Sequence, residues 1–326
     1  MEGDEGVQMR RLVMQEIAKF SSGLGCVVAP LLGQDHAGHP VIFTSVQDGS
    51  EVGCWDIDTG ETIWHDNEGV SGCNDQVLVP IPGGGFFLVV ATEDGIEWWD
   101  GATGQYRSDM AWDGGTIWSL SVGLSAHGRP LVFGAGHDGA VYHWDGLSGD
   151  LLGAAAAKHE PRSLMAISFV SLPGDSGMVV AGDDAGFIRR WSLATGREIG
   201  EPILAHASQV RIIETLQGVT DPLFVSCDQD GSMQKWNAVS GVPIGRPIES
   251  GSEVYSLSAA KVGDAAVMFT AGEDEIVRMY DVHTNKSIST SLRSVVTSSL
   301  NQSNGATLLA TSTGQGDIVL HRCSSD

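Results

Sequence analysis

The chain lacks any apolar run long enough to span a membrane, and its first residues are acidic where a secretory signal would place basic and apolar ones. Its five cysteines are odd in number and have no paired-ligand spacing, so we expect neither a disulfide framework nor a zinc site. These absences predict a cytoplasmic protein with no membrane partner.

Basic residues are also scarce. Only 18 Lys and Arg stand against 41 Asp and Glu, which gives a formal net charge of -23. A surface with this excess of negative charge repels phosphate backbones, so we expect no nucleic-acid partner, whereas a basic protein or peptide fits the charge. Arg outnumbers Lys, and Ala and Gly are abundant, which is typical of a bacterial protein from a GC-rich genome.

The common catalytic motifs are missing as well. The sequence has no Walker loop, no Gly-x-Ser-x-Gly elbow, no Cys-x-x-Cys pair and no His-Glu-x-x-His helix. The nearest approach to a metal site is the loop with Asp35, His36 and His39, which could present a carboxylate and two imidazoles to a divalent ion. Polar residues at this density are ordinary in loops, so we expect no metal, and no motif calls for a cofactor.

What the chain does contain is an internal repeat. Seven times, a turn rich in Asp and Gly leads into a short strand that ends at one marked position, and these positions lie 41 to 47 residues apart. The marked positions are Trp55, Trp99, Trp144, Trp191, Trp236, Tyr280 and His321. A period this regular indicates seven structural units of similar size.

Each unit can be divided into four strands. In the second unit, turn residues separate the segments Val77–Pro82, Phe86–Thr92, Ile96–Asp100 and Gln105–Asp109. One such sheet cannot bury both of its faces alone, so sheets of this size stack around an axis. The sequence therefore predicts an all-β fold, a seven-bladed β-propeller of four-stranded antiparallel blades that forms a single domain over residues 1–326.

The Asp-Gly turn, the marked Trp with its following Asp and a second Thr-Gly or Ser-Gly turn resemble the WD-repeat (WD40) family of β-propellers, in the form common in bacteria. The resemblance covers nearly the whole chain, although several repeats depart from the pattern. It implies that a strand from the N-terminus completes the last blade and closes the ring. Residues 7–14 are the candidate for this strand, and residues 1–6 are expected to be disordered.

The resemblance also implies a structural hydrogen-bond set of His, Ser or Thr, Asp and Trp. One unit matches all four positions, with His206, Ser226, Asp230 and Trp236. A buried Trp N–H and a buried imidazole both need partners, so we interpret these residues as a brace within the fold.

A candidate binding site comes from aligning the starts of the inner strands. Trp118, Arg211 and Tyr255 occupy the same place in their units, and Asp75 and Arg293 lie near it in others. The adjoining loops add further large side chains, namely Trp112 and Arg162. The resemblance implies that this position opens onto the top face around the central channel, and these residue types are enriched in binding hot spots.

Three classes of function fit these observations. The first is a platform whose top face binds a protein or peptide. The second is a metal-independent enzyme of the lyase, cyclase or isomerase type, in which Asp75 acts as base and Arg211 or Tyr255 stabilises charge at the channel mouth. The third is a binder of small ligands or glycans that stack on exposed Trp. Local packing of the same side chains against neighbouring blades is the structural alternative to all three.

Overall fold

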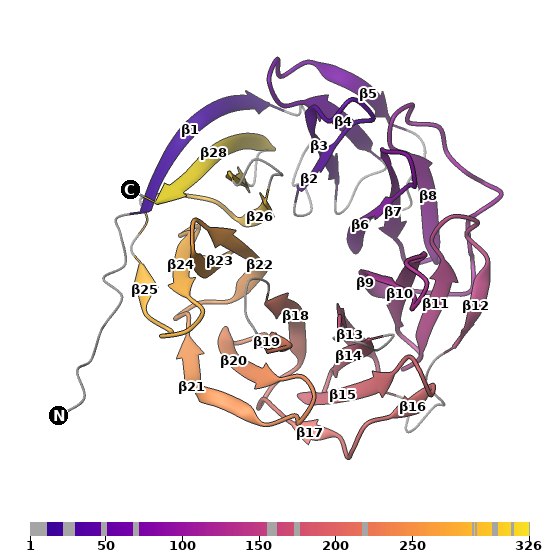
Figure 1. Ribbon diagram of the computed structural model, residues 1–326, viewed down its shortest axis with the longest axis vertical. Helices are drawn as coiled ribbons and strands as arrows, with labels where there is room; N and C mark the ends of the chain where they lie inside the picture. Colours follow the sequence, from indigo (N-terminus) through magenta and orange to yellow (C-terminus); the bar gives the residue numbers. More distant parts are fainter. Residues whose placement is uncertain are drawn as a thin grey trace.

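The computed structural model describes residues 12–21, 30–46, 51–67, 72–154, 162–172, 177–216, 221–288, 290, 292–301, 306–313 and 316–325. Seven antiparallel sheets surround a central axis as the blades of a propeller (Figure 1), which confirms the predicted seven-bladed β-propeller. The described ranges contain strands and turns but no helix, in agreement with an all-β fold, and therefore no helix that could cross a membrane.

Within each blade the strands follow one another from the axis outward (Figure 1). The inner strands are β2 (Leu31–Gln34), β6 (Asp75–Pro80), β9 (Ile117–Leu124), β13 (Leu164–Val170), β18 (Val210–Leu216), β22 (Val254–Val262) and β26 (Val296–Asn301). The second strands are β3 (Pro40–Ser45), β7 (Phe86–Ala91), β10 (Pro130–Gly136), β14 (Met178–Asp183), β19 (Leu223–Asp228), β23 (Ala265–Gly272) and β27 (Thr307–Ser312). We number the blades 1 to 7 in this order.

The third strands end at or just beyond the marked positions of blades 1 to 6. They are β4 (Val52–Asp56), β8 (Ile96–Asp100), β11 (Val141–Asp145), β15 (Phe187–Ser192), β20 (Ser232–Asn237), β24 (Arg278–Asp281) and, in blade 7, β28 (Asp317–Ser325). The outer strands are β5 (Thr62–Asp66), β12 (Leu151–Ala154), β16 (Arg197–Glu198) with β17 (Ile203–Leu204), β21 (Pro243–Glu249), β25 (Ser287–Ile288) and β1 (Leu12–Ser21).

The ring is closed by a strand from the N-terminal part of the chain, as predicted. β1 is the outer strand of blade 7 and pairs antiparallel with β28, from Leu12 opposite Ser325 to Ser21 opposite Asp317. The predicted segment, residues 7–14, overlaps this strand only at its beginning. Residues 1–11, which include the segment expected to be disordered, lie outside the described residues.

Blade 2 departs from the four-strand prediction. The expected outer strand Gln105–Asp109 is reduced to two isolated bridges, which join Trp99 to Tyr106 and Ile96 to Trp112. Between them the backbone turns, because the Met110 amide donates to the Arg107 carbonyl at 2.9 Å. Met110 is 2% exposed and packs in the core between blades 2 and 3, so its burial draws the chain inward and ends the strand.

The core is divided among the interfaces between blades. Each of the seven hydrophobic clusters found in the described ranges combines side chains of two adjacent blades. Trp144 of blade 3, for example, packs with Val79 and Trp98 of blade 2. The marked aromatic residues of blades 1 to 6 all lie against the preceding blade in this way. A blade therefore depends on its neighbours to bury its apolar faces.

Candidate functional site

Four inner strands share one irregularity near their first residue. Their pairing with the second strand shifts register by one extra residue, which is a β-bulge. The extra residues are Trp118 in β9, Met165 in β13, Arg211 in β18 and Tyr255 in β22. Their strands β9, β13, β18 and β22 belong to consecutive blades and follow one another around the axis (Figure 1), and we call the four residues the bulge arc.

The sequence around each bulge explains its geometry. The residue just before it is apolar and nearly completely buried, as with Val210 before Arg211 and Val254 before Tyr255. That residue holds the start of the strand between two blades, and the bulge then turns the extra side chain away from the sheet faces. Tyr255 is consequently 46% exposed and Arg211 is exposed. We define the top face as the face at which the inner strands begin, so the bulge arc borders its centre.

Arg211 and Tyr255 interact across the interface between blades 5 and 6. Partial burial, with Glu253 and Glu273 close by, raises the pKa of Tyr255, whereas the charge of Arg211 acts in the opposite direction. When the Gln209 amide oxygen faces Arg211, the guanidinium Nε and Nη2 atoms donate to it at 3.2 and 3.1 Å. Arg211 and Tyr255 thus lie close enough across this interface for the charge of Arg211 to act on the Tyr255 hydroxyl.

Trp118 and Met165 are half-buried members of the arc. The Trp118 ring meets the His137 ring edge to face, with centroids 6.2 Å apart, and Ser163 Oγ lies 2.8 Å from His137 Nδ1. Trp118 Nε1 makes no hydrogen bond within the described part of the chain. This end of the arc therefore presents a partly exposed aromatic ring, whose N–H is buried and has no acceptor among the described residues.

Three other predicted site residues occupy different surroundings. Trp112 packs against Tyr142 and Trp144, with centroid distances of 4.9 and 5.3 Å, so its contacts are those of a core residue. Arg162 precedes β13, on the segment that enters blade 4. Arg293 is exposed ahead of β26, where it forms an isolated bridge with Ile276, and it lies outside the inner strand.

Asp75 lies at the start of an inner strand that has no bulge. Its carboxylate accepts hydrogen bonds from the Leu120 amide at 2.7 Å and from Ser119 Oγ at 3.0 Å, both on the next inner strand. Similar bonds join other inner strands, since Ser119 Oγ accepts from the Ile167 amide and Ser256 Oγ from the Thr297 amide. Asp75 therefore belongs to a belt of side chains that link neighbouring blades around the channel.

A second carboxyl group in this belt, Glu214 of β18, was not predicted. It accepts a hydrogen bond from the Ala259 backbone, and burial raises its pKa to about 7, with a further contribution from Asp75. Burial likewise raises the pKa of Asp75 to about 6, against the effect of its hydrogen bonds. The two groups belong to inner strands of blades 5 and 2, which line the central channel (Figure 1), and the charge of Asp75 adds to the raised pKa of Glu214. The only sequence signal was an acidic residue within an otherwise largely apolar inner strand.

The predicted hydrogen-bond set of blade 5 is present, but with a different carboxylate. His206 Nε2 lies 2.6 Å from Ser226 Oγ, which also accepts the Trp236 indole N–H at 2.9 Å. The partner of His206 Nδ1 is Asp228, at 3.3 Å, whereas Asp230 is exposed in the turn. Burial lowers the pKa of His206, and the Asp228 carboxylate partly counters this effect. The prediction of Asp230 was wrong because Asp228, the last residue of β19, is the carboxylate that lies beneath the turn.

The second-strand position occupied by Ser226 varies among the other blades, and in several of them its residue type matches the hydrogen bonding of the marked residue. In blades 6 and 7 it holds Thr270 and Thr311, which hydrogen-bond Tyr280 and His321. In blades 2 to 4 the same register position holds Val90, Gly134 and Ala181, which carry no hydroxyl. The indole nitrogens of Trp99 and Trp144 accordingly have no hydrogen-bond partner among the described residues.

In the loop considered as a metal site, the Asp35 carboxylate is hydrogen-bonded to backbone amides of the same loop. Asp35 Oδ1 accepts from the Ala37 and His39 amides, both at 2.8 Å, and Asp35 Oδ2 lies 3.2 Å from His39 Nδ1. The described ranges contain no group of three His, Cys, Asp or Glu side chains arranged to hold a metal ion.

The bulge arc thus combines two aromatic side chains, a thioether and a guanidinium around the channel mouth. No protein-family model matches the chain, and no curated protein shows significant similarity to it. The structure shows a seven-bladed β-propeller, and this architecture is compatible with the WD40-type fold.

Proposed function

We propose that this chain is a WD-repeat-type interaction platform that captures a protein or peptide on its top face, around the central channel. The observation that supports it is the bulge arc, in which four consecutive blades each turn one large side chain out of the sheet at the same register position. Trp, Tyr and Arg are the residues that most often dominate binding energy at interfaces. A bulge fixes their direction before a partner arrives, which lowers the entropic cost of binding.

The charge of the protein indicates which kind of partner is favoured. The net charge of -23 favours a partner with basic segments.

 We expect this attraction to speed association and to weaken as salt rises, because exposed charges are screened over about 8 Å at physiological ionic strength. A cytoplasmic setting in a bacterial cell is part of the same proposal, in line with the composition.

The test compares wild type with Trp118→Ala and Arg211→Ala in affinity capture from a lysate of the producing cell, followed by direct binding measurements with the protein recovered. Each variant should lose the partner while its melting temperature stays close to that of wild type. Arg197→Ala, which removes an Arg from the outer strand β16, is the matched control and should retain the partner. A large loss of stability in Arg211→Ala would show instead that Arg211 is a packing residue.

The two channel carboxyls favour a second candidate, a metal-independent enzyme with its pocket at the channel mouth. Asp75 and Glu214 have pKa values raised to about 6 and about 7, near the range in which a carboxyl group can exchange protons at neutral pH. Both also bond the neighbouring inner strand, which gives them a structural role. Turnover of a small molecule that disappears in Asp75→Asn and Glu214→Gln, with partner capture unchanged, would support this candidate over the platform.

A further inference from the structure

A pair of residues recurs beside each member of the bulge arc. The first residue lies two positions before the bulge residue, the second follows the second strand, and the backbone amide of the second donates to the carbonyl of the first at 3.0 or 3.1 Å. The two residues therefore extend the antiparallel ladder as an opposed pair, with side chains on one face and Cβ atoms about 5 Å apart. The pairs are Thr116 with His137, Ser163 with Asp184, Gln209 with Gln229, and Glu253 with Glu273.

Blades 5 and 6 fill these two positions differently. In blade 5 the side-chain amides of Gln209 and Gln229 meet, with their nearest atoms 2.5 Å apart. In blade 6 the same positions hold two carboxylates, Glu253 and Glu273. Ionised carboxylates carry no donor for one another, and like charges directly opposite in a sheet destabilise it. A cation that binds between Glu253 and Glu273 would remove this repulsion.

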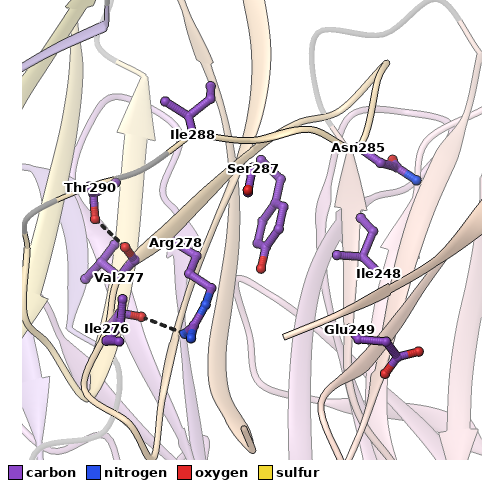
Figure 2. A pocket seen from close by; sticks show the side chains of 10 residues that line it. Ile248, Glu249, Ile276, Val277, Arg278, Asn285, Ser287, Ile288 and Thr290 are labelled. Carbon is purple, nitrogen blue, oxygen red and sulfur yellow. Dashed lines mark hydrogen bonds between the residues drawn. The ribbon is translucent and has the colours of Figure 1, made fainter. Parts of the chain in front are cut away.

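Two cations of blade 6 are engaged elsewhere. Arg278 donates to the Asp274 carboxylate at 3.1 Å, and it lines a cavity of about 500 Å³ between the outer parts of blades 5 and 6 (Figure 2). Arg293 donates to the Asp274 carbonyl at 3.5 Å. Within the described ranges, neither Glu253 nor Glu273 forms an ion pair or a side-chain hydrogen bond. Both carboxylates are therefore available to a donor from outside the chain.

Tyr255 adds an aromatic surface beside this pair. Its side chain is turned out of the sheet by the bulge and is 46% exposed. Partial burial and the charges of Glu253 and Glu273 raise the pKa of Tyr255, which places both carboxylates near its hydroxyl. Glu253 is half-buried and Glu273 is exposed, so the pair remains open to solvent on the top face. A cation over the face of a Tyr ring is attracted by the ring electrons.

We propose that Glu253, Glu273 and Tyr255 together bind one Lys or Arg side chain of a protein or peptide captured on the top face. The charged head donates to the two carboxylates and lies against the Tyr255 ring. The net charge of -23 attracts such a segment to the surface. This inference rests on the platform proposed above, and it places a basic residue of the partner at blade 6.

A blocked glycine-arginine-glycine peptide is a suitable probe, with the citrulline peptide as its neutral counterpart of the same shape. Titration calorimetry at low ionic strength should show saturable binding of the arginine peptide to wild type, and binding of the citrulline peptide that is at least roughly tenfold weaker. Glu253→Gln, Glu273→Gln and Tyr255→Ala should each weaken binding of the arginine peptide by roughly threefold.

Glu93→Gln is the matched control, since Glu93 is an exposed carboxylate in the turn between β7 and β8 and its loss changes the net charge by the same amount. This variant should bind the arginine peptide as wild type does. Arg211→Ala removes a positive charge that acts on Tyr255, so it should tighten binding of the arginine peptide by roughly twofold. The platform predicts the opposite response to Arg211→Ala, namely loss of the partner.

Three results would overturn the inference: no saturable binding of the arginine peptide, equal binding of the citrulline peptide, or equal weakening by Glu93→Gln and Glu273→Gln. None of them bears on the platform itself, which is tested by partner capture with Trp118→Ala. A platform that fails shows separately, as capture that survives Trp118→Ala.

Discussion

Replacing Glu214 by Gln is expected to stabilise the protein above neutral pH and to leave its stability nearly unchanged at pH 4 to 5. The pKa of Glu214 rises from 4.5 to about 7 on folding, because the inner strands shield the carboxyl group from water. Each pKa unit corresponds to about 1.4 kcal/mol. The full shift would amount to about 3 kcal/mol, and because the side chain is only half-buried within the channel we expect about 2 kcal/mol.

The direction follows from proton binding. Between the unfolded pKa near 4.5 and the folded pKa near 7, the native state binds more protons than the unfolded state. The free energy of unfolding of wild type therefore falls as the pH rises through this window. Above the folded pKa, Glu214 causes no further decrease. Glutamine keeps an oxygen for the Ala259 amide and carries no charge, so the variant lacks this part of the decline.

Urea denaturation of wild type and Glu214→Gln at pH 5 and at pH 8 measures the effect directly. Asp75, whose pKa also rises on folding, titrates in both proteins, so the difference between them reports Glu214 together with its interaction with Asp75. Identical pH dependence in the two proteins would refute the reasoning, and a variant that is less stable at pH 8 would show that the ionised carboxylate is favoured in the channel.

Three further predictions concern the fold. Val90→Thr should supply the hydroxyl that blade 2 lacks and stabilise the protein by about 1 kcal/mol through a bond to Trp99, as measured by urea denaturation; a clear loss of stability would count against the register comparison with blade 5. Asp228→Asn should cost about 1 to 3 kcal/mol because it weakens the contact with His206, whereas Asp230→Asn should change stability by less than about 0.5 kcal/mol; equal effects in the same assay would contradict the assignment. Deleting residues 1–21 should lower the melting temperature and promote association through the freed edge of β28. A peptide of residues 12–21 should reverse both effects, as measured by calorimetry and size-exclusion chromatography. An unchanged melting temperature would show that β1 contributes little to stability.

The sequence predicted the number of blades because the repeat period does not depend on how any one blade is completed. It also aligned Trp118, Arg211 and Tyr255 at one register position, although it predicted no bulge there. It failed where a tertiary contact overrides local pattern. Met110 ends the outer strand of blade 2 by entering a core that only the assembled ring creates. The choice between Asp228 and Asp230 depends on the shape of one turn, which spacing alone does not determine.

The same limit applies to the inner strands. Asp75 was expected at the binding surface because it aligns with the start of its strand, but its hydrogen bonds lead to the next blade. Glu214 gave no motif, because its surroundings come from several inner strands that are distant in sequence.

Every hydrophobic cluster of the described ranges is shared by two blades. The core side chains of each repeat must therefore fit those of the neighbouring blades, and they need not follow one consensus sequence. A substitution in one blade can be compensated in the adjoining blade, so individual repeats can lose features such as the second-strand hydroxyl while the ring persists. The same arrangement ties the two ends of the polypeptide together in blade 7, where β1 lies beside β28. Partial unfolding from either terminus therefore begins with the separation of these two strands, and the strength of their pairing sets how readily the whole ring opens.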